Sequence, residues 1–371
     1  MQIRQLDTTK KQERARFVDF AFDLYKDSEL WVPPIRSDMM RILDKSKHPF
    51  FEHSHGDFFV VEEGDTVLGR MGMLENRSFN NYHGSKVAFF SYFEVVENIE
   101  VARILLKKAV EWAKEYGLDT VIGPRGVANI DGSVLVEGFE HRPALTIPWN
   151  FPYYDAFIKD SGFGKDSDYL SGYASGDHEI PPRLYEIAAR VKEKRGYRIK
   201  TFSSKAEIRE WIPLAMKVHR EAMSGLHSFF PPTERETRAI VDSLLTIVDP
   251  SLIKLVMKGD EIAGFLIAYH DVSAGIQKAR GRLFPFGWFH ILRDRRVTDW
   301  ANINGLGLLP QYRGVGANAL LYTELRDTIK THGFKHVDIV QVNENNFNSR
   351  SDMETMGIQW YKRHRHYKLV L

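Results

Sequence analysis

The stretch Pro310-Gln311-Tyr312-Arg313-Gly314-Val315-Gly316 decides the fold of the C-terminal half of this chain. It follows residues 300–309, which have the pattern of a strand, and it leads directly into a helical pattern that begins at Ala317. Glycines between a strand and a helix let a phosphate group approach the backbone closely. The first turn of the helix adds unpartnered N–H groups and the positive end of the helix dipole. The stretch therefore predicts a pyrophosphate site.

The segments around this stretch predict a mixed sheet with helices. Residues 252–257 and 262–270 have the pattern of a hairpin around the turn Lys258-Gly259-Asp260-Glu261. The helix that starts at Ala317 is expected to end before Gly333, and residues 336–342 follow as a buried strand. This second strand is expected to lie beside the strand that precedes the glycines.

The hexapeptide 311–316 lacks the lysine of a Walker A loop and the spacing of a dinucleotide-binding fold. It resembles motif A of the GNAT superfamily of N-acetyltransferases, Q/R-x-x-G-x-G/A, and the resemblance covers residues 198–371. It implies an α/β (α+β) fold, in which a mixed, mostly antiparallel sheet is flanked by helices. It also implies acetyl-CoA, or another acyl-CoA, as the co-substrate. A strand-to-helix turn with purely structural glycines is the alternative.

The resemblance assigns cofactor contacts along the motif. The backbone of the two leucines before Pro310 is implied to hold the pantetheine and the acyl carbonyl, and the loop with the first helical residue is implied to hold the pyrophosphate. Asparagines after the second strand are implied to contact the cofactor, with turn chemistry and helix capping as their alternative. The predicted contacts are Leu308, Leu309, Gln311, Arg313, Gly314, Val315, Gly316, Ala317, Asn343 and Asn346.

The groups that move protons are harder to predict. Many GNAT enzymes have a tyrosine four residues before the glycine that ends the last helix, and here that position is Met353. Tyr361, with Tyr322 and Tyr154 behind it, is the candidate acid, although tyrosines more often pack as amphipathic side chains. Asp299, and behind it Asp271, is the candidate base, although either aspartate can simply form a turn. Because the chain has no cysteine, direct attack by an amine in a ternary complex is expected.

The two halves of the chain echo each other. One predicted helix ends at Gly117 and is followed by a strand. A second helix ends at Gly333, 216 residues later, and is followed by a strand in the same way. We interpret this as a duplication, with a degenerate GNAT-like domain at 1–175, a GNAT acyltransferase domain at 176–371, and a linker helix within 176–197. At the same offset, the motif aligns with Val95-Val96-Glu97-Asn98-Ile99-Glu100, which has no glycine and two carboxylates. The whole pattern is similar to bacterial tandem-GNAT proteins of uncharacterised substrate.

Composition bounds the remaining possibilities. The chain has 371 residues, 43% of them hydrophobic and 27% charged, with a net charge of +2, which predicts two ordinary globular domains without a general affinity for nucleic acid. No signal peptide or membrane-spanning run is recognisable, so a cytoplasmic protein is expected. His48, His53 and His55 do not form a convincing ligand set, so no metal is predicted. Nothing in the sequence predicts an oligomeric state.

Two further segments leave alternatives open. The loop at 126–154 is rich in glycine, proline and aromatic residues, and either lines the acceptor site or packs between domains. Residues 277–296 place arginines around Leu283-Phe284-Pro285-Phe286-Gly287-Trp288-Phe289. We expect these aromatics to pack on the other domain. The alternatives are a membrane surface, a nucleic acid, and an acyl or acidic substrate.

The leading hypothesis is an acetyl-CoA-dependent N-acyltransferase that acts on a small-molecule or peptide amine. The first alternative is a GNAT-like CoA-binding sensor or scaffold, because Met353 replaces the usual acid. The second keeps the fold but uses long-chain acyl-CoA or aminoacyl-tRNA as the donor. The acceptor lies on loops whose chemistry no motif fixes.

Overall fold

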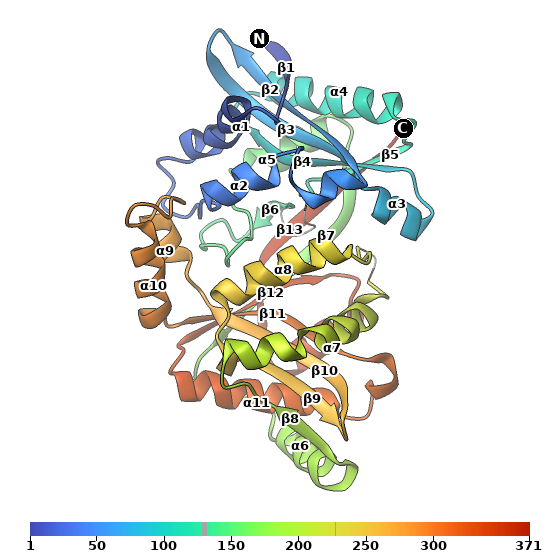
Figure 1. Cartoon of the computed structure of the whole chain (residues 1–371), viewed down its shortest axis with the longest axis vertical. Coiled ribbons are helices and arrows are strands. Elements are labelled where there is room, and N and C mark those ends of the chain that lie inside the picture. Colours follow the sequence, from blue (N-terminus) through green and yellow to red (C-terminus); the bar gives the residue numbers. More distant parts are fainter. Residues whose placement is uncertain (128–131, 227) are drawn as a thin grey trace. The chain divides into compact units, whose positions relative to one another are not determined.

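The computed structural model describes residues 1–127, 132–226 and 228–371. The chain divides into two compact units, whose elements are labelled in Figure 1. The first unit contains residues 1–169, 272–296 and 362–371, and the second contains residues 170–271 and 297–361. Each unit therefore takes segments from both sequence halves. The predicted duplication with its boundary after residue 175 stays a prediction.

The sheet of the first unit is antiparallel except for one pair. Its β4 and β5 run parallel, with Val87 opposite Thr120 and Phe89 opposite Ile122. Its last strand, β13, is the end of the chain and pairs antiparallel with β5 and β6. The strand order is β1 (Gln2–Leu6), β2 (His55–Glu63), β3 (Thr66–Glu75), β4 (Val87–Val95), β5 (Thr120–Gly123) and β13 (Gln359–Val370), with β6 (Val134–Glu137) beside β13.

The core of the first unit forms under α4, whose apolar face is continuous. Leu105, Ala109 and Trp112 lie one helical turn apart on that face and are buried against the sheet. The Trp112 indole also donates a 2.8 Å hydrogen bond to Asp57. The helices are α1 (Lys11–Leu24), α2 (Arg36–Ile42), η1 (Pro49–Glu52), α3 (Arg77–His83), α4 (Ile99–Glu115), α5 (Tyr153–Asp160), α9 (Ser273–Lys278) and most of α10 (Gly287–Val297).

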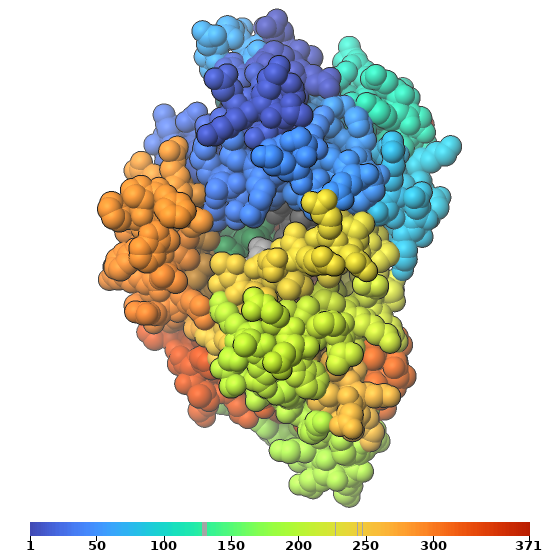
Figure 2. Space-filling model, in the orientation of Figure 1, coloured from blue at the N-terminus to red at the C-terminus, as the bar shows by residue number. Residues whose placement is uncertain are grey.

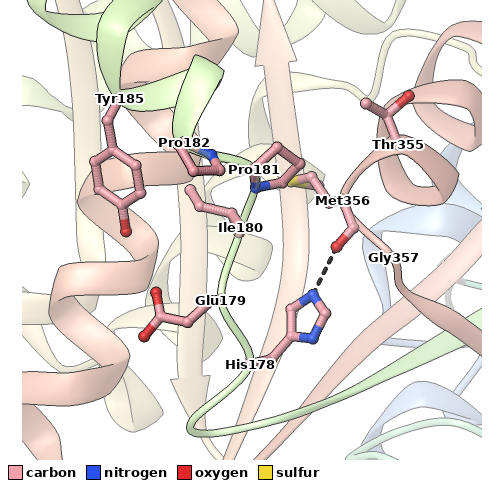
Figure 3. A pocket seen from close by; sticks show the side chains of 9 residues that line it. All are labelled: His178, Glu179, Ile180, Pro181, Pro182, Tyr185, Thr355, Met356 and Gly357. Carbon is pink, nitrogen blue, oxygen red and sulfur yellow. Dashed lines mark hydrogen bonds between the residues drawn. The ribbon is translucent and has the colours of Figure 1, made fainter.

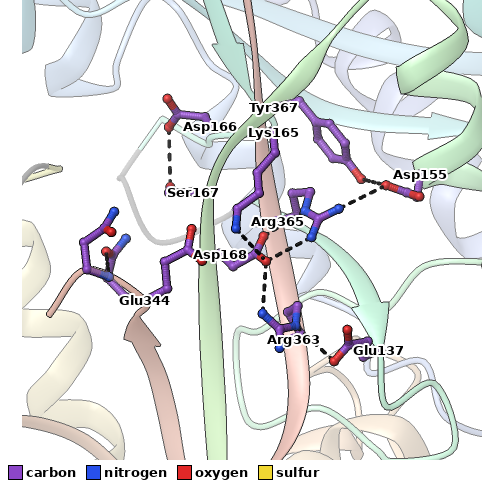
Figure 4. Close-up of polar contacts among 12 residues, drawn as sticks. Glu137, Asp155, Lys165, Asp166, Ser167, Asp168, Glu344, Arg363, Arg365 and Tyr367 are labelled. Carbon is purple, nitrogen blue, oxygen red and sulfur yellow. Dashed lines mark hydrogen bonds and ion pairs between the residues drawn. The ribbon is translucent and has the colours of Figure 1, made fainter. Parts of the chain in front are cut away.

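A buried carboxylate fixes the chain's last strand in the first unit. Asp168 accepts two hydrogen bonds from Arg365, of 2.8 and 2.9 Å, and one of 3.2 Å from Arg363. Lys165 lies 3.3 Å from the same carboxylate, and Tyr367 donates to Asp155 nearby (Figure 4). Because a buried charge is costly without partners, these contacts specify where β13 must pair.

The second unit has the strand order β7-β12-β11-β10-β9-β8, in which β11 and β12 run parallel and β8 to β11 are antiparallel. One core cluster lies between the sheet, α6 and α11, and another lies under α7 and α8. The strands are β7 (Gly164–Ser175), β8 (Tyr197–Lys200), β9 (Ile253–Lys258), β10 (Glu261–His270), β11 (Trp300–Leu308) and β12 (His336–Asn343). The helices are α6 (Pro182–Arg195), α7 (Lys205–Met223), α8 (Glu234–Ile247), η2 (Pro250–Leu252), η3 (Pro310–Tyr312), α11 (Ala317–His332) and α12 (Phe347–Thr355).

The predicted fold class is confirmed, since both units have mixed, mostly antiparallel sheets with helices packed on them. The hairpin appears as β9 and β10, and the motif helix spans Ala317–His332 as predicted. Its C-terminal Gly333 has the left-handed conformation that glycine adopts without strain. The predicted strand after it is β12. The loop at 126–154 contains a short strand, β6, that its irregular composition did not reveal, and residues 128–131 of that loop lie outside the described residues.

Candidate functional site

The predicted anion loop joins β11 to α11. Gly314 and Gly316 have φ values of +72° and +86°, which are strained for any residue with a Cβ. The helix N-cap is Gly316, which has no side chain to cap the helix, and no acidic residue lies in the first turn. Among described residues, no main-chain carbonyl accepts from the amides of Gly314, Val315, Gly316 or Ala317. These amides and the helix dipole form a local environment suited to an anion.

The two glycines are required for different reasons. A Cβ at Gly316 would lie 2.6 Å from Ile187 and 3.1 Å from Val191, so α6 packs directly on the loop. A Cβ at Gly314 would meet no atom within 4 Å, so only the backbone conformation demands glycine there. The open space beside Gly314 is where a phosphate group could approach the backbone.

Side chains of the motif hold the loop in place. Tyr312 donates a 2.6 Å hydrogen bond to Glu261 at the start of β10, which raises the tyrosine pKa to about 12. Arg313 donates to the carbonyls of Leu308 and Ala222, at 3.1 and 2.9 Å. The Arg313 guanidinium therefore stabilises the end of β11 and leaves phosphate contacts to the backbone. Gln311 is exposed.

The strands β11 and β12 pair over only part of their length. Four parallel pairs run from Trp300 opposite His336 to Ile303 opposite Ile339. Beyond these pairs, β11 continues to Leu308 and β12 continues to Asn343, but the two strands no longer pair with each other. This divergence leaves an unpaired edge on β11, where a pantetheine arm could form strand-like hydrogen bonds.

The backbone groups of the two leucines are largely used within the chain. The Leu309 N–H donates to Ala263, and the Leu309 carbonyl accepts from Tyr312, both at 2.9 Å. The Leu308 carbonyl accepts from Arg313. We therefore place the available edge of β11 earlier, between Ile303 and Leu308.

A row of buried polar side chains crosses the sheet where the strands diverge. Tyr269 on β10 lies opposite Asn302 on β11, which in turn lies opposite Asp338 on β12. All three residues are at most 4% exposed. Neither amide atom of Asn302 has a hydrogen-bond partner within the described part of the chain. A buried, unpaired amide costs about 1–3 kcal/mol, so this row marks a candidate site for polar chemistry.

Tyr361, the predicted acid, reaches this polar row. Its phenol donates a 2.7 Å hydrogen bond to Asp338. Burial, followed by the nearby Asp338 charge, raises the pKa of Tyr361, so the phenol holds its proton at neutral pH. Because that proton points at Asp338, the carboxylate is the group of the pair that can accept a proton.

His219 on α7 lies near the open end of β11 and was not predicted from the sequence. Its ring is 5.3 Å from the ring of Phe265, which pairs with Gly307 on β11. Burial lowers the pKa of His219, so its imidazole is neutral at pH 7 and can accept a proton. Its position in an otherwise ordinary amphipathic helix gave no sequence signal.

The two predicted bases lie on the other side of the row. Asp299 precedes β11 and ion-pairs with Lys335 at 3.6 Å, while its carbonyl accepts from the amides of Lys335 and His336. At about 3.3 Å per residue it lies roughly 30 Å from Leu308, at the far end of the strand. Asp271 is buried at the end of β10, close enough to Tyr361 to affect its pKa.

The two alternative tyrosines have structural partners. Tyr322 donates a 2.7 Å hydrogen bond to Asp352, which links α11 to α12. Tyr154 is buried in the first unit, where its phenol donates to Glu94 and accepts from the N–H of Val95. Burial raises the pKa of both tyrosines well above the ordinary value.

The predicted asparagines and Met353 take ordinary structural roles. The Asn343 side chain accepts from the N–H of Asn345, as in an Asx turn, and Asn346 caps α12 by accepting from Ser349. Their carbonyl oxygens are thus occupied within the chain. Met353 is buried in the apolar core of the second unit, so no proton donor stands at that position.

The equivalent place in the first unit is built differently. The N-terminus of α4 is capped by Asn98, whose side chain accepts from the N–H of Glu100 at 3.0 Å. Tyr153 donates to the Val95 carbonyl at 2.8 Å, and Tyr154 binds the Val95 N–H. Side chains of α5 therefore cover the end of β4, and a side chain satisfies the helix terminus.

A separate hollow of about 520 Å³ lies in the second unit at the start of α6 and the end of α12 (Figure 3). His178 hydrogen-bonds to the Met356 carbonyl at 2.6 Å across one side of it. Apolar atoms of Ile180, Pro181 and Tyr185 line most of the remaining wall. It lies outside the anion loop and the polar row, so we do not assign it to the candidate site.

No known family model matches the chain. The chain is 24% identical over 366 residues to the protein YghO of Escherichia coli (strain K12), covering 96% of this chain and 93% of YghO. It is also 24% identical over 370 residues to a protein of Caulobacter vibrioides (strain NA1000 / CB15N) named bacterial ceramide synthase, covering 97% and 95% of the two chains.

Solved structures share the whole architecture. A tandem GNAT protein from the clavulanic acid biosynthesis pathway matches with a TM-score of 0.58 and 13% identity, over 100% of this chain and 98% of that chain. A GCN5-related glucosamine N-acetyltransferase region in a fungal multi-domain GH3 beta-N-acetylglucosaminidase matches with a TM-score of 0.55 and 12% identity, over 99% of this chain and 38% of that chain. At these identities the likeness concerns the fold.

Proposed function

Because this chain has a tandem GNAT fold, we propose that it is an acyl-CoA-dependent N-acyltransferase with one acyl-CoA site, in the second unit. The uncapped N-terminus of α11 carries this proposal, since the loop of Gly314 and Gly316 presents free amides and no carboxylate. In the first unit, Asn98 already satisfies the equivalent helix terminus and Glu100 adds negative charge there.

The residues present fit an acyl-CoA. The amides of residues 314–317 would hold the pyrophosphate, and the unpaired edge of β11 would hold the pantetheine. The bound thioester supplies an acyl group activated for attack by an amine. Gly305 and Gly307 place no side chain on this part of β11. The side chains of Phe265 and Met223 cover Gly307, where an added Cβ would lie 2.9 and 3.2 Å from them. These contacts set an apolar boundary for the acyl group.

The chain's own proton acceptors are the Asp338–Tyr361 pair and His219. An alkylammonium has a pKa near 10.4 and must lose a proton before it can attack. The Asp338 carboxylate accepts a hydrogen bond from the Tyr361 phenol, and burial lowers the pKa of His219 and keeps its imidazole neutral at pH 7, so we assign the role of base to one of these two groups. Since the chain has no cysteine, we propose direct attack by the amine with both substrates bound.

The relative named bacterial ceramide synthase favours a lipid amine as acceptor and a fatty acyl-CoA as donor. A ceramide is an amide of a fatty acid and a long-chain amino alcohol, so its formation is N-acylation. Acetyl-CoA with a small-molecule or peptide amine remains the alternative pair of substrates. A CoA-binding sensor without turnover is the second candidate function, favoured by the apolar Met353 at the usual acid position.

Calorimetric titration of the purified full chain with CoA, acetyl-CoA and palmitoyl-CoA tests the donor site. We expect binding that is lost in Gly314→Glu, because a carboxylate would stand beside the pyrophosphate. Gly333→Glu is the matched control, since Gly333 lies at the other end of α11 with φ +68° and open space. Absence of binding to all three ligands by the folded protein would refute the proposal.

Turnover is tested separately by release of free CoA in the presence of long-chain amino alcohols, small amines and peptides. We expect amide product with at least one of these amine classes and none with Gly314→Glu. Binding without turnover across all of them would favour the sensor function. Product with long-chain amino alcohols alone would establish the lipid acceptor.

A further inference from the structure

Residues 272–296 present an apolar surface to solvent. Phe284, Phe286 and Phe289 are 82%, 73% and 56% exposed, and Trp288 and Leu292 are about half exposed. We call these five residues the aromatic patch. The sequence predicts packed aromatic side chains here, and these exposed fractions contradict that expectation. Large aromatic side chains are rarely left in solvent together, so a contiguous patch indicates a binding surface.

The patch is held on a braced support within the first unit. Gln277 donates to the carbonyls of Glu29 and Trp31, and the Gly281 carbonyl accepts from the N–H of Arg36 at 2.8 Å. A Cβ at Gly281 would lie 2.4 Å from the Pro34 carbonyl, so the segment packs closely on its own unit. Figure 2 shows the segment 272–296, in orange, at the surface.

The tip of the patch is fixed by its own hydrogen bonds. The Trp288 indole N–H donates to the Pro285 carbonyl at 3.0 Å. The backbone N–H of Trp288 donates to the Leu283 carbonyl at 2.9 Å. A Cβ at Gly287 would lie 1.7 Å from the Arg282 carbonyl, so only glycine permits this turn. The Trp288 indole thus helps to hold the turn, while the rings of Phe284, Phe286 and Phe289 are mostly exposed to solvent.

The same segment is strongly basic. It carries six Lys or Arg side chains and one carboxylate, a net charge of +5, while the whole chain carries only +2. The carboxylate, Asp294, accepts from the N–H of Gly275 at 2.7 Å and serves the turn between α9 and α10. The basic residues that flank the patch are Lys278, Arg280, Arg282, Arg293, Arg295 and Arg296.

We propose that the aromatic patch docks on an anionic lipid bilayer, with its rings inserted at the interface and its arginines on the lipid headgroups. Segments that bind the membrane–water interface typically combine phenylalanine, leucine and tryptophan with arginine. A nucleic acid is disfavoured because the exposed apolar area is mostly phenylalanine and leucine, and the remaining surface has no excess of positive charge. No described helix has both the length and the hydropathy needed to cross a membrane.

Co-sedimentation of the full chain with vesicles of phosphatidylcholine, with and without 30% phosphatidylglycerol, tests this docking. We expect about tenfold or stronger association with the anionic vesicles, weakened by salt. The triple variant Phe284→Ser, Phe286→Ser, Phe289→Ser is expected to lose at least about tenfold in association. Phe347→Ser, which removes an exposed phenylalanine from the second unit, is the matched control and should bind like the wild type.

Two further variants separate charge from insertion. Arg293→Gln with Arg296→Gln should weaken association with anionic vesicles and reduce its dependence on salt. Trp288 fluorescence should be quenched by brominated lipids, and the quenching should be absent in Trp288→Phe. These side chains are exposed, so the variants should fold, and unchanged thermal unfolding checks this directly.

The docking proposal is independent of acyl transfer. The triple variant should retain CoA binding, and Gly314→Glu should retain vesicle association. Equal vesicle association of the wild type and the triple variant, or no association of the wild type at low salt, would overturn the docking proposal. Preferential binding of a single-stranded RNA probe over anionic vesicles would overturn it as well.

Discussion

The phenol of Tyr361 donates a 2.7 Å hydrogen bond to the carboxylate of Asp338, which lies one residue before the last parallel pair of β11 and β12. Asp338 also lies opposite the buried, unpaired Asn302. A protonated tyrosine, a carboxylate and an unpaired amide thus meet where the two strands separate. This arrangement places a carboxylate and a protonated phenol beside the part of β11 that lacks a pairing strand.

Asp338→Asn removes the proton acceptor of this pair. We expect kcat to fall by about 10²-fold or more and Tyr361→Phe to cost about tenfold, because the phenol only links the carboxylate to the site. CoA affinity should stay unchanged in both. Tyr322→Phe removes a similar buried tyrosine–aspartate bond, to Asp352, and should leave kcat unaffected. Measured kcat and calorimetric CoA binding decide between these outcomes.

His219→Gln tests the imidazole beside Phe265, which lies opposite Gly307 near the carboxyl end of β11. Burial lowers the pKa of His219 below the ordinary histidine value, so the neutral base is present at pH 7 and is lost only at more acidic pH. We expect the acid limb of the kcat profile to disappear in the variant, with kcat reduced about tenfold at pH 7. An unchanged acid limb would assign it to another group.

Gly316→Ala and Gly314→Ala are a matched pair in one loop. Both positions have positive φ, so each substitution should cost about 1 kcal/mol in backbone strain. Only at Gly316 does the new Cβ also meet Ile187, at 2.6 Å, which should add about 1–3 kcal/mol. Urea unfolding measures both free energies, and equal values would show that α6 moves aside without cost.

Asn98→Ala removes the side-chain cap of α4 in the first unit. The free energy of unfolding should fall by about 1 kcal/mol, because the N–H of Glu100 loses its partner. CoA affinity should not change, since this helix terminus carries Glu100 and α5 covers the end of β4. Any gain or loss of CoA binding would show that the first unit contributes to the donor site.

Acid should destabilise the protein through His364. This histidine is fully buried beside the Pro148 carbonyl, and burial lowers its pKa to about 4. The unfolded chain takes up the proton near pH 6.5, so stability is complete above that value and is lost as pH falls toward 4. Protonation linked to His364 should lower the free energy of unfolding by about 3 kcal/mol over this range.

His364→Gln checks the assignment, because glutamine can keep a hydrogen bond to Pro148 without titrating. Its stability should change less than that of the wild type between pH 6.5 and pH 4, when both are followed by urea unfolding. His141→Gln is the control, because the His141 side chain is 43% exposed, and it should preserve the wild-type pH dependence. If the free energies of unfolding of the wild type and His364→Gln fall equally with pH, another group causes the loss of stability in acid.

The sequence by itself determined the glycine loop between β11 and α11 and the elements that flank it. The glycines at 314 and 316 permit the positive φ values found there, and the apolar patterns before and after them specify a strand and a helix. All of these are local properties. Local sequence patterns also predicted the hairpin of β9 and β10. They also showed that the corresponding stretch 95–100 lacks glycine, where Asn98 caps the helix instead.

Only the tertiary structure decided which polar side chains meet. Asn302 and Asp338 are single polar residues within apolar strands, a signal that could have drawn attention to them, but strand register alone places them side by side. Asp299 precedes β11 and therefore lies at the opposite end of that strand from the glycine loop, where it pairs with Lys335. Exposure of the aromatic patch likewise depends on the support formed by residues 29–36, far away along the chain. Contacts between distant residues follow from packing, and no local pattern in the sequence encodes them.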